Sequence, residues 1–227
     1  VKIDVSGNEI WSQTFGGSAL DEAHSVQETL DGGFILAGIS NSFGAGDYDG
    51  YLVKTDASGN EIWSQTFGGN NEDNINSVGE TSDGSLILAG GTRSFGVAPG
   101  YSNMYLVKTD ASGNEIWSQT FGGSDLERAY SVQETSDGGF ILIGFTRSFG
   151  AGDDDVYLVK TDVSGNEIWS QTFGGSDDDR AYSVQETSDG SFIFAGHTRS
   201  YGAGSGDMYL VKIDVSGNEI WSQTFGG

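Results

Sequence analysis

Short apolar runs alternate with short polar turns along this chain, and the same order of runs recurs over its whole length. In residues 129–173 the runs are AYSVQET, GFILIGFT, VYLVKTD and NEIWSQTF. They are rich in β-branched and aromatic residues and too short for helices, so each predicts a β-strand. The intervening SDGG and VSGN segments suit tight antiparallel hairpins. Each repeat is therefore expected to be a four-stranded meander, whose strands are named A to D here.

The repeat is marked by the heptapeptide WSQTFGG, which begins at Trp11, Trp63, Trp117, Trp169 and Trp221, with spacings of 52, 54, 52 and 52 residues. A period near 50 with four strands per unit is typical of a β-propeller blade. The sequence thus predicts an all-β propeller of four-stranded antiparallel blades, as a single domain over residues 1–227. The repeat units span residues 11–62, 63–116, 117–168 and 169–220. Their near-identity indicates recent duplication or an engineered consensus.

Strands B to D carry a more specific pattern: DGGFILIG, a glycine-rich loop, D-x-YLVKTD, SGNEIW and then FGG. This pattern resembles the tandem propeller repeats of secreted and surface proteins in archaea and bacteria. Its order of Tyr, Asp and Trp is also similar to kelch and quinoprotein blades, although the kelch double glycine after strand B is missing. The resemblance implies a propeller fold and an extracellular or cell-surface location, and it implies no reaction.

Residues 211–227 repeat residues 1–17 letter for letter, so strand D occurs five times while strands A, B and C occur four times. One D strand is therefore surplus to a ring of four blades. The first D strand could complete the last blade of a closed monomeric ring, which is the arrangement we favour slightly. Alternatively, two chains could form an eight-bladed ring, or the surplus strand could pair with a neighbouring molecule.

Antiparallel pairing places the D-to-A and B-to-C loops on one face of the ring, called the loop face here. The turns on the other face barely vary between repeats, whereas the loop face varies strongly. Such variation fits a ligand surface on a fixed scaffold, and it also fits drift in solvent-exposed loops. One variable column directly follows the strand B glycine and is predicted to lie at a channel mouth without a shared packing partner. The candidate ligand residues are this column and three nearby arginines: Ile39, Gly91, Phe145, His197, Arg93, Arg147 and Arg199.

The formal charge is −23, from 10 Lys and Arg against 33 Asp and Glu. Such a charge would repel nucleic acid and anionic membranes, so neither is an expected partner. No apolar run approaches the roughly 20 residues that cross a bilayer, so membrane insertion is not expected. Because Val1 lies inside a repeat motif, the chain is expected to be a mature piece or a fragment. The absence of cysteine excludes thiolate chemistry.

Many of the acids lie in the loop face. Asp153, Asp154 and Asp155 precede one strand C, while Asp177, Asp178 and Asp179 precede the next strand A, so the two runs could converge. Oxygen ligands of this kind suit Ca²⁺, the one cofactor that the sequence suggests. No fixed ligand spacing is present, and solvated acids with Asp–Arg pairing are the favoured alternative.

Two further acidic columns recur in every repeat: Asp21, Asp73, Glu127 and Asp179 before strand A, and Asp49, Asn103, Asp155 and Asp207 before the strand C tyrosine. Their regularity predicts hydrogen bonds that close the loops. The five repeated tryptophans could stack on sugars, but their constant strand setting favours packing between neighbouring blades.

An enzyme is not expected. The two histidines, His24 and His197, occupy different repeat columns, and no nucleophilic triad or zinc spacing is visible. A carboxylate pair for glycoside cleavage is conceivable, but nearly equivalent blades do not favour a single asymmetric site. The sequence therefore predicts an extracellular binding module whose acidic loop face contacts a glycan, a cation or a surface protein. The alternative is a structural protein that self-associates into an array, a filament or an eight-bladed dimer.

Overall fold

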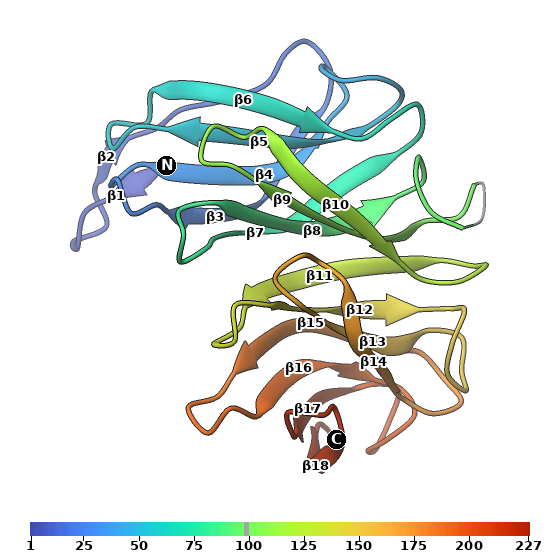
Figure 1. Ribbon diagram of the computed structural model, residues 1–227. Helices are drawn as coiled ribbons and strands as arrows, with labels where there is room; N and C mark the ends of the chain where they lie inside the picture. The colour runs from blue at the N-terminus through green and yellow to red at the C-terminus, as the bar shows by residue number, and fades with distance from the viewer. Residues whose placement is uncertain (98–99) are drawn as a thin grey trace.

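The computed structural model describes residues 1–97 and 100–227, which form four four-stranded sheets and one short hairpin (Figure 1). The hairpin consists of β1 (Lys2–Ile3) and β2 (Glu9–Trp11). Blade 1 consists of β3 (Asp21–Glu28), β4 (Phe34–Ser40), β5 (Asp49–Thr55) and β6 (Glu61–Phe67). Blade 2 consists of β7 (Asp73–Glu80), β8 (Leu86–Thr92), β9 (Asn103–Thr109) and β10 (Glu115–Phe121).

Blade 3 consists of β11 (Glu127–Glu134), β12 (Phe140–Thr146), β13 (Asp155–Thr161) and β14 (Glu167–Phe173). Blade 4 consists of β15 (Asp179–Glu186), β16 (Phe192–Thr198), β17 (Asp207–Ile213) and β18 (Glu219–Phe225). Within every blade the strands pair antiparallel in sequence order, so the predicted four-stranded meanders are confirmed. The second B-to-C loop, between β8 and β9, includes residues 98–99, which lie outside the described residues.

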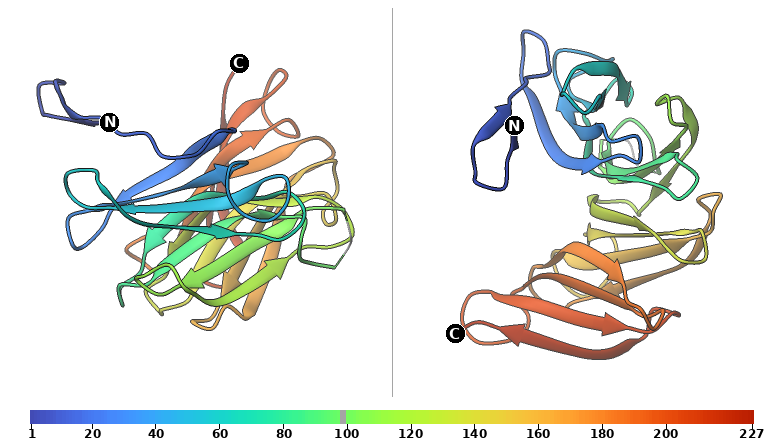
Figure 2. Two further views of the ribbon diagram at one scale, coloured as in Figure 1. Left: turned by 90° about the horizontal axis from the view of Figure 1, so that it is seen from above. Right: turned by 90° about the vertical axis from the view of Figure 1, so that its left-hand side faces the viewer.

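Consecutive blades pack through their first strands. Strand β3 lies against β7, β7 against β11, and β11 against β15, while the second strand of each blade also packs on the first strand of the next. The first strands therefore line the axis of the fan of blades, and the fourth strands lie at its rim (Figure 2). The hydrophobic core lies between the blades; one cluster joins Leu106 and Phe121 of blade 2 to Phe140 and Val159 of blade 3.

The repeated tryptophans pack between blades, as the sequence predicts. The ring of Trp117 meets Phe140 of the next blade edge to face at 5.8 Å, and Trp169 meets Phe192 at 6.2 Å. Trp117 also covers Gly165, whose φ of +80° and whose contact with the indole both require glycine, because a Cβ would lie 2.7 Å from the ring. Trp221 differs: no blade follows it in the described residues, and 37% of it is exposed.

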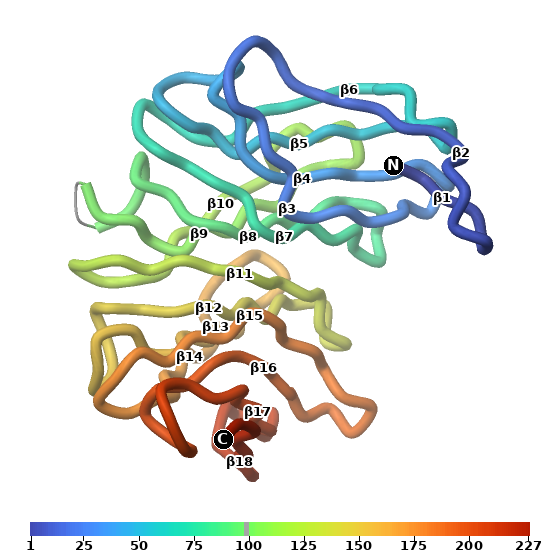
Figure 3. Tube along the Cα trace, turned by 180° about the vertical axis from the view of Figure 1, so that it is seen from behind, coloured from blue at the N-terminus to red at the C-terminus, as the bar shows by residue number. Residues whose placement is uncertain are grey.

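The expected closure of a four-bladed ring by the first D strand is wrong. Strand β18, from the second copy of the repeated segment, takes the D position of blade 4, while β2 pairs with β1. The hairpin and blade 4 lie at opposite ends of an open fan (Figure 3). The two D copies are identical, so chain connectivity decides between them. Pairing β17 with the adjacent β18 closes a short turn, which costs less entropy than bringing in a strand some 200 residues away.

Candidate functional site

Four side chains on the innermost strands differ between blades that are otherwise nearly alike. They are His24, Asn76, Tyr130 and Tyr182, called the axial residues here. Each is the extra residue of a β-bulge: the register of strand A shifts between its two neighbours in all four blades. A bulge leaves its extra residue unpaired and changes the direction of the side chain. The fold thus uses one repeated irregularity to present an imidazole, an amide and two phenol rings along the axis.

The axial residues connect each first strand to the next. The imidazole Nδ1 of His24 lies 3.1 Å from the carbonyl oxygen of Ile75, and the Asn76 amide donates to the carbonyl oxygen of Ala129 at 2.7 Å. The rings of Tyr130 and Tyr182 lie 5.2 Å apart. Burial raises the pKa of Tyr130, so its hydroxyl is protonated at neutral pH. The axis therefore presents two adjacent phenol rings beside an amide and an imidazole.

The predicted mouth column lies at the loop-face end of the second strands, opposite a second variable column of strand A. The registers pair Ile39 with Glu22, Gly91 with Asn74, Phe145 with Arg128, and His197 with Arg180. These residues lie beside the axis, as expected. Phe145 has packing partners of its own and is only 4% exposed. Its ring stacks on Tyr130 at 5.9 Å and lies 4.8 Å from the Arg180 guanidinium of the next blade.

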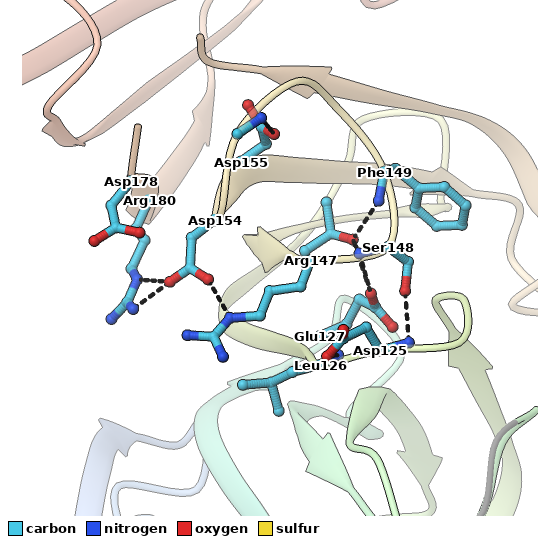
Figure 4. A network of polar contacts seen from close by, with 12 residues as sticks. Asp125, Leu126, Glu127, Arg147, Ser148, Phe149, Asp154, Asp155, Asp178 and Arg180 are labelled. Atoms are coloured by element: carbon cyan, nitrogen blue, oxygen red, sulfur yellow. Dashed lines mark hydrogen bonds and ion pairs between the residues drawn. The ribbon is translucent and has the colours of Figure 1, made fainter. Parts of the chain in front are cut away.

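The loop-face arginines form ion pairs across the blade junctions. Glu72 pairs with Arg93 at 2.7 Å and with Arg128 at 3.8 Å. The fully buried Asp154 accepts from the Nε of Arg147 at 2.6 Å and from the Nε of Arg180 at 2.5 Å (Figure 4). Asp154 raises the pKa of Arg147 by hydrogen bonding, and it also favours the charged form of Arg180 against burial. The third predicted arginine, Arg199, pairs with Asp178 at 2.8 Å. Asp–Arg pairing, the favoured interpretation of the acidic loops, is confirmed.

Replacing Asp154 with asparagine is expected to lower the free energy of unfolding by about 1–3 kcal/mol, because two guanidinium groups would lose their shared carboxylate. Partial exposure of both arginines limits the loss. Asp178→Asn is the matched control, since its pair with Arg199 is more exposed and is worth less than about 1 kcal/mol. Urea unfolding of both variants tests this, and equal losses would contradict the assigned role of Asp154.

The two acidic runs converge at the junction of blades 3 and 4, where the carboxylates of Asp155 and Asp179 both face Gly174, but the described residues form no metal site there. Asp155 accepts from the backbone amides of Ala151 and Gly152, and Asp179 accepts from the amide of Gly175 and the hydroxyl of Ser200. Among the described residues, Asp153 and Asp177 belong to no group of acids that could share a metal ion. Nowhere in residues 1–97 and 100–227 do three acids or histidines lie together as a metal site. The calcium prediction is corrected on this basis: no three acids are grouped as ligands in the described residues, and Asp154 is bound by two arginines while Asp155 and Asp179 accept from loop amides.

The two recurring acid columns close the loops, as predicted. Asp73 accepts from the amide of Gly69 at 2.7 Å, and Asp49 accepts from the amide of Ala45 at 2.7 Å. Both carboxylates face Gly68, where a Cβ would lie 2.0 Å from an oxygen of Asp49 and 2.6 Å from an oxygen of Asp73. Burial raises the pKa of Asp49 to about 6, opposed by the Ala45 amide and reinforced by Asp73. A pair of buried acids therefore lies at this junction.

The same pair recurs between blades 3 and 4, where burial raises the pKa of Asp155 and Asp179 reinforces the shift. Between blades 2 and 3 the sequence differs: Asn103 replaces the first acid, and its amide donates to Glu127 at 3.1 Å. That exchange converts a repulsive pair into a hydrogen bond.

Sequence reasoning missed the axial residues and the role of Arg128 and Arg180. The signal was present, because the variation of the D-to-A loops extends to the fourth residue of strand A, where the axial residues lie. A bulge cannot be recognised from the alternation of polar and apolar residues alone, so the direction of these side chains was not accessible.

The geometry can be compared with known proteins. A family model, PQQ_2, described as outer membrane protein assembly factor BamB, matches residues 1–227. The chain belongs to the PQQ_2 family. This membership confirms the predicted β-propeller repeats. The described residues contain no helix of the length and apolarity that a membrane span requires.

The other matches are distant. The regulatory protein FlaEY of Caulobacter vibrioides is 24% identical over 152 residues, which cover 56% of this chain and 16% of FlaEY. The crystal structure of Sqt1 from Chaetomium thermophilum matches with a TM-score of 0.50 and 16% identity, over 90% of this chain and 48% of Sqt1. A crystal structure of a eukaryotic initiation factor has a TM-score of 0.41 and 8% identity. The chain thus spans about half of Sqt1 and a sixth of FlaEY.

Proposed function

We propose that this PQQ_2 chain is a non-enzymatic, extracellular or cell-surface binding module whose ligand binds along the axis at the loop face. One observation carries the proposal: the side chains that differ between nearly identical blades are neighbours on the innermost strands. A scaffold that keeps its blades constant while varying one converging set of residues is suited to recognition. The location follows from the resemblance to secreted and surface repeats.

The chemistry of the axial residues suits a neutral glycan. Tyr182 is 49% exposed and lies beside Tyr130, and aromatic faces of this kind stack on the apolar face of a sugar ring. His24 and Asn76 add hydrogen-bonding groups for hydroxyls. A polyanionic ligand is disfavoured, because the net charge is −23 and the nearby arginines are already paired with carboxylates. Nucleic acid is therefore not a proposed partner.

The absence of catalysis is proposed on the same geometry. The buried loop-face carboxylates of Asp73, Asp154 and Asp179 accept hydrogen bonds from loop amides or arginines, so they help to hold the fold. The imidazole of His24 lies against the carbonyl oxygen of Ile75 on one side and 3.7 Å from the carboxylate of Glu22 on the other, so both of its nitrogens have partners. A hydrolytic site needs a free acid and base around one substrate position.

A glycan array run on the full chain, with and without Ca²⁺, tests the proposal. Once a binding glycan is found, Tyr182→Ala is expected to weaken the affinity for that glycan at least tenfold, because stacking on an exposed ring is lost. The protein should remain folded, since this ring is half exposed. Tyr101→Ala is the matched control, because Tyr101 is equally exposed but lies in an outer loop.

Two results would contradict the proposal. No glycan binding under either condition would remove the proposed ligand class, and loss of binding only in Tyr101→Ala would move the site from the axis to the outer loops. Binding that depends on Ca²⁺ would contradict the assignment of the acids to loop closure.

A further inference from the structure

The two end blades of the fan carry apolar faces that the inner blades bury. On the face of blade 1 that points away from blade 2, Val26 is 66% exposed, whereas the equivalent Val78 and Val132 are 7% and 8% exposed. On the outer face of blade 4, Met208 is 67% exposed, whereas the equivalent Met104 and Val156 are fully buried. Each end therefore presents one half of an inter-blade contact.

Residues 1–17 already cover part of the apolar face of blade 1 that points away from blade 2. Trp11 meets Phe34 of blade 1 edge to face at 5.7 Å, as Trp117 meets Phe140 at 5.8 Å. Trp11 also covers Gly59, just as the other tryptophans cover the turn glycine of the next blade. The β1–β2 register pairs Lys2 with Trp11, and β17–β18 pairs Lys212 with Trp221 in the same way. The hairpin therefore imitates the last two strands of a preceding blade.

The hairpin fills this position incompletely, because it has no counterpart of strands A and B. A cavity of about 450 Å³ remains against blade 1, lined among others by Phe15, Val26, Phe34 and Leu36. At the inner junctions the equivalent space is filled by the second and third strands of the neighbouring blade. A complete blade would thus cover more of this face than the hairpin covers.

A polar ladder gives the two ends matching partners. In each inner junction a backbone amide of one A-to-B turn donates to a glutamate of the next blade at 2.7 Å: Leu30 to Glu80, Ser82 to Glu134, and Ser136 to Glu186. The end members of this series are the amide of Ser188 in blade 4 and the carboxylate of Glu28 in blade 1. Within residues 1–97 and 100–227 neither has a hydrogen-bond partner. The two ends are therefore complementary in both apolar and polar groups.

We propose that a second copy of this chain binds these faces: blade 4 of one copy packs on blade 1 of the other and displaces residues 1–17. Two such contacts are related by a two-fold axis and close a ring of eight blades, within the usual range for propellers. The hairpin then acts as a removable cap, whose sequence is the same as that of the segment that replaces it.

The identical heptapeptides supply a sharp test. Trp11→Ala weakens the cap and is expected to lower the concentration of half-dimerisation at least tenfold. Trp221→Ala removes a side chain through which the second copy docks, so it is expected to raise the concentration of half-dimerisation at least tenfold. Both variants are measured on the full chain by sedimentation and native mass spectrometry, in about 0.15 M salt, where charges are screened beyond about 8 Å.

A third variant does not touch either tryptophan. Glu28→Ala leaves an exposed position of the monomer but removes the acceptor for Ser188, so it should weaken dimerisation while the free energy of unfolding stays unchanged. The proposal is overturned if Trp11→Ala and Trp221→Ala change dimerisation in the same direction, or if all variants remain monomeric up to about 0.1 mM. Open polymers in place of a dimer would overturn the two-copy ring.

Discussion

Replacing Trp117 by alanine is expected to lower the free energy of unfolding by about 3 kcal/mol. Its indole lies half-buried between blades 2 and 3, against Phe140 and over Gly165, and truncation leaves a cavity that neither blade can fill. Large aromatic side chains removed from a core cost about 3–5 kcal/mol, and partial exposure places Trp117 at the lower end. Urea unfolding followed by far-ultraviolet circular dichroism measures the loss.

Trp221→Ala is the matched control, because the same heptapeptide surrounds it while no blade covers it in the described residues. Its expected cost is below about 1 kcal/mol when the protein is dilute enough to be monomeric. Equal losses for the two variants would mean that the tryptophans act within their own sheets, and inter-blade packing would no longer explain their repetition.

The repeated pattern was sufficient to predict the blades and their contacts. Strand alternation, turn residues and the constant setting of Trp117 all favour the same structure, so local and tertiary preferences agree. The loop-closing role of Asp73 was predictable for the same reason, since an acid that recurs in every loop requires a recurring partner.

Two features were not accessible from the sequence. The predicted ring closure was wrong because two identical D strands have equal local preferences. Only chain connectivity favours β18 over β2 as the fourth strand of blade 4. The axial position of Tyr182 was missed because a bulge changes which face a side chain takes, without altering the alternation pattern. The calcium prediction failed because Asp154 has no spare oxygen once Arg147 and Arg180 bind it.

Exchanging the acid and the amide at the blade junctions should change how stability depends on pH. In the unfolded chain Asp49 loses its proton near the ordinary value of 3.8, whereas burial raises its pKa to about 6 in the folded state. Between these values the folded state holds the extra proton, so stability falls as pH rises. Below pH 3.8 Asp49 is protonated in both the folded and the unfolded state. Above about pH 6 it is ionised in both states, and the loss of stability is complete. A rise from 3.8 to about 6 corresponds to roughly 3 kcal/mol.

Asp49→Asn removes this loss, since asparagine resembles the protonated acid and blade 2 already has an asparagine at this position. The variant is expected to be more stable than the parent by about 2–3 kcal/mol at pH 7, and the difference should vanish near pH 4. The amide of Ala45 keeps an acceptor in the variant, because an asparagine side chain retains one oxygen. Unfolding free energies measured from pH 4 to pH 8 give the difference curve.

The reverse exchange, Asn103→Asp, should introduce the same pH dependence of stability at the junction of blades 2 and 3, where it is now absent. It removes the hydrogen bond to Glu127 and places two buried carboxylates together, so stability at pH 7 should fall by about 2–3 kcal/mol and recover on acidification. Other titrating groups are common to all three proteins and cancel in the differences. Curves for Asp49→Asn and Asn103→Asp that run parallel to the parent at every pH would show that burial at these junctions does not raise the pKa of an acid. Opposite curves would mean that the protein keeps a proton-sensitive contact between blades 1 and 2, while Asn103 makes the next junction insensitive to pH.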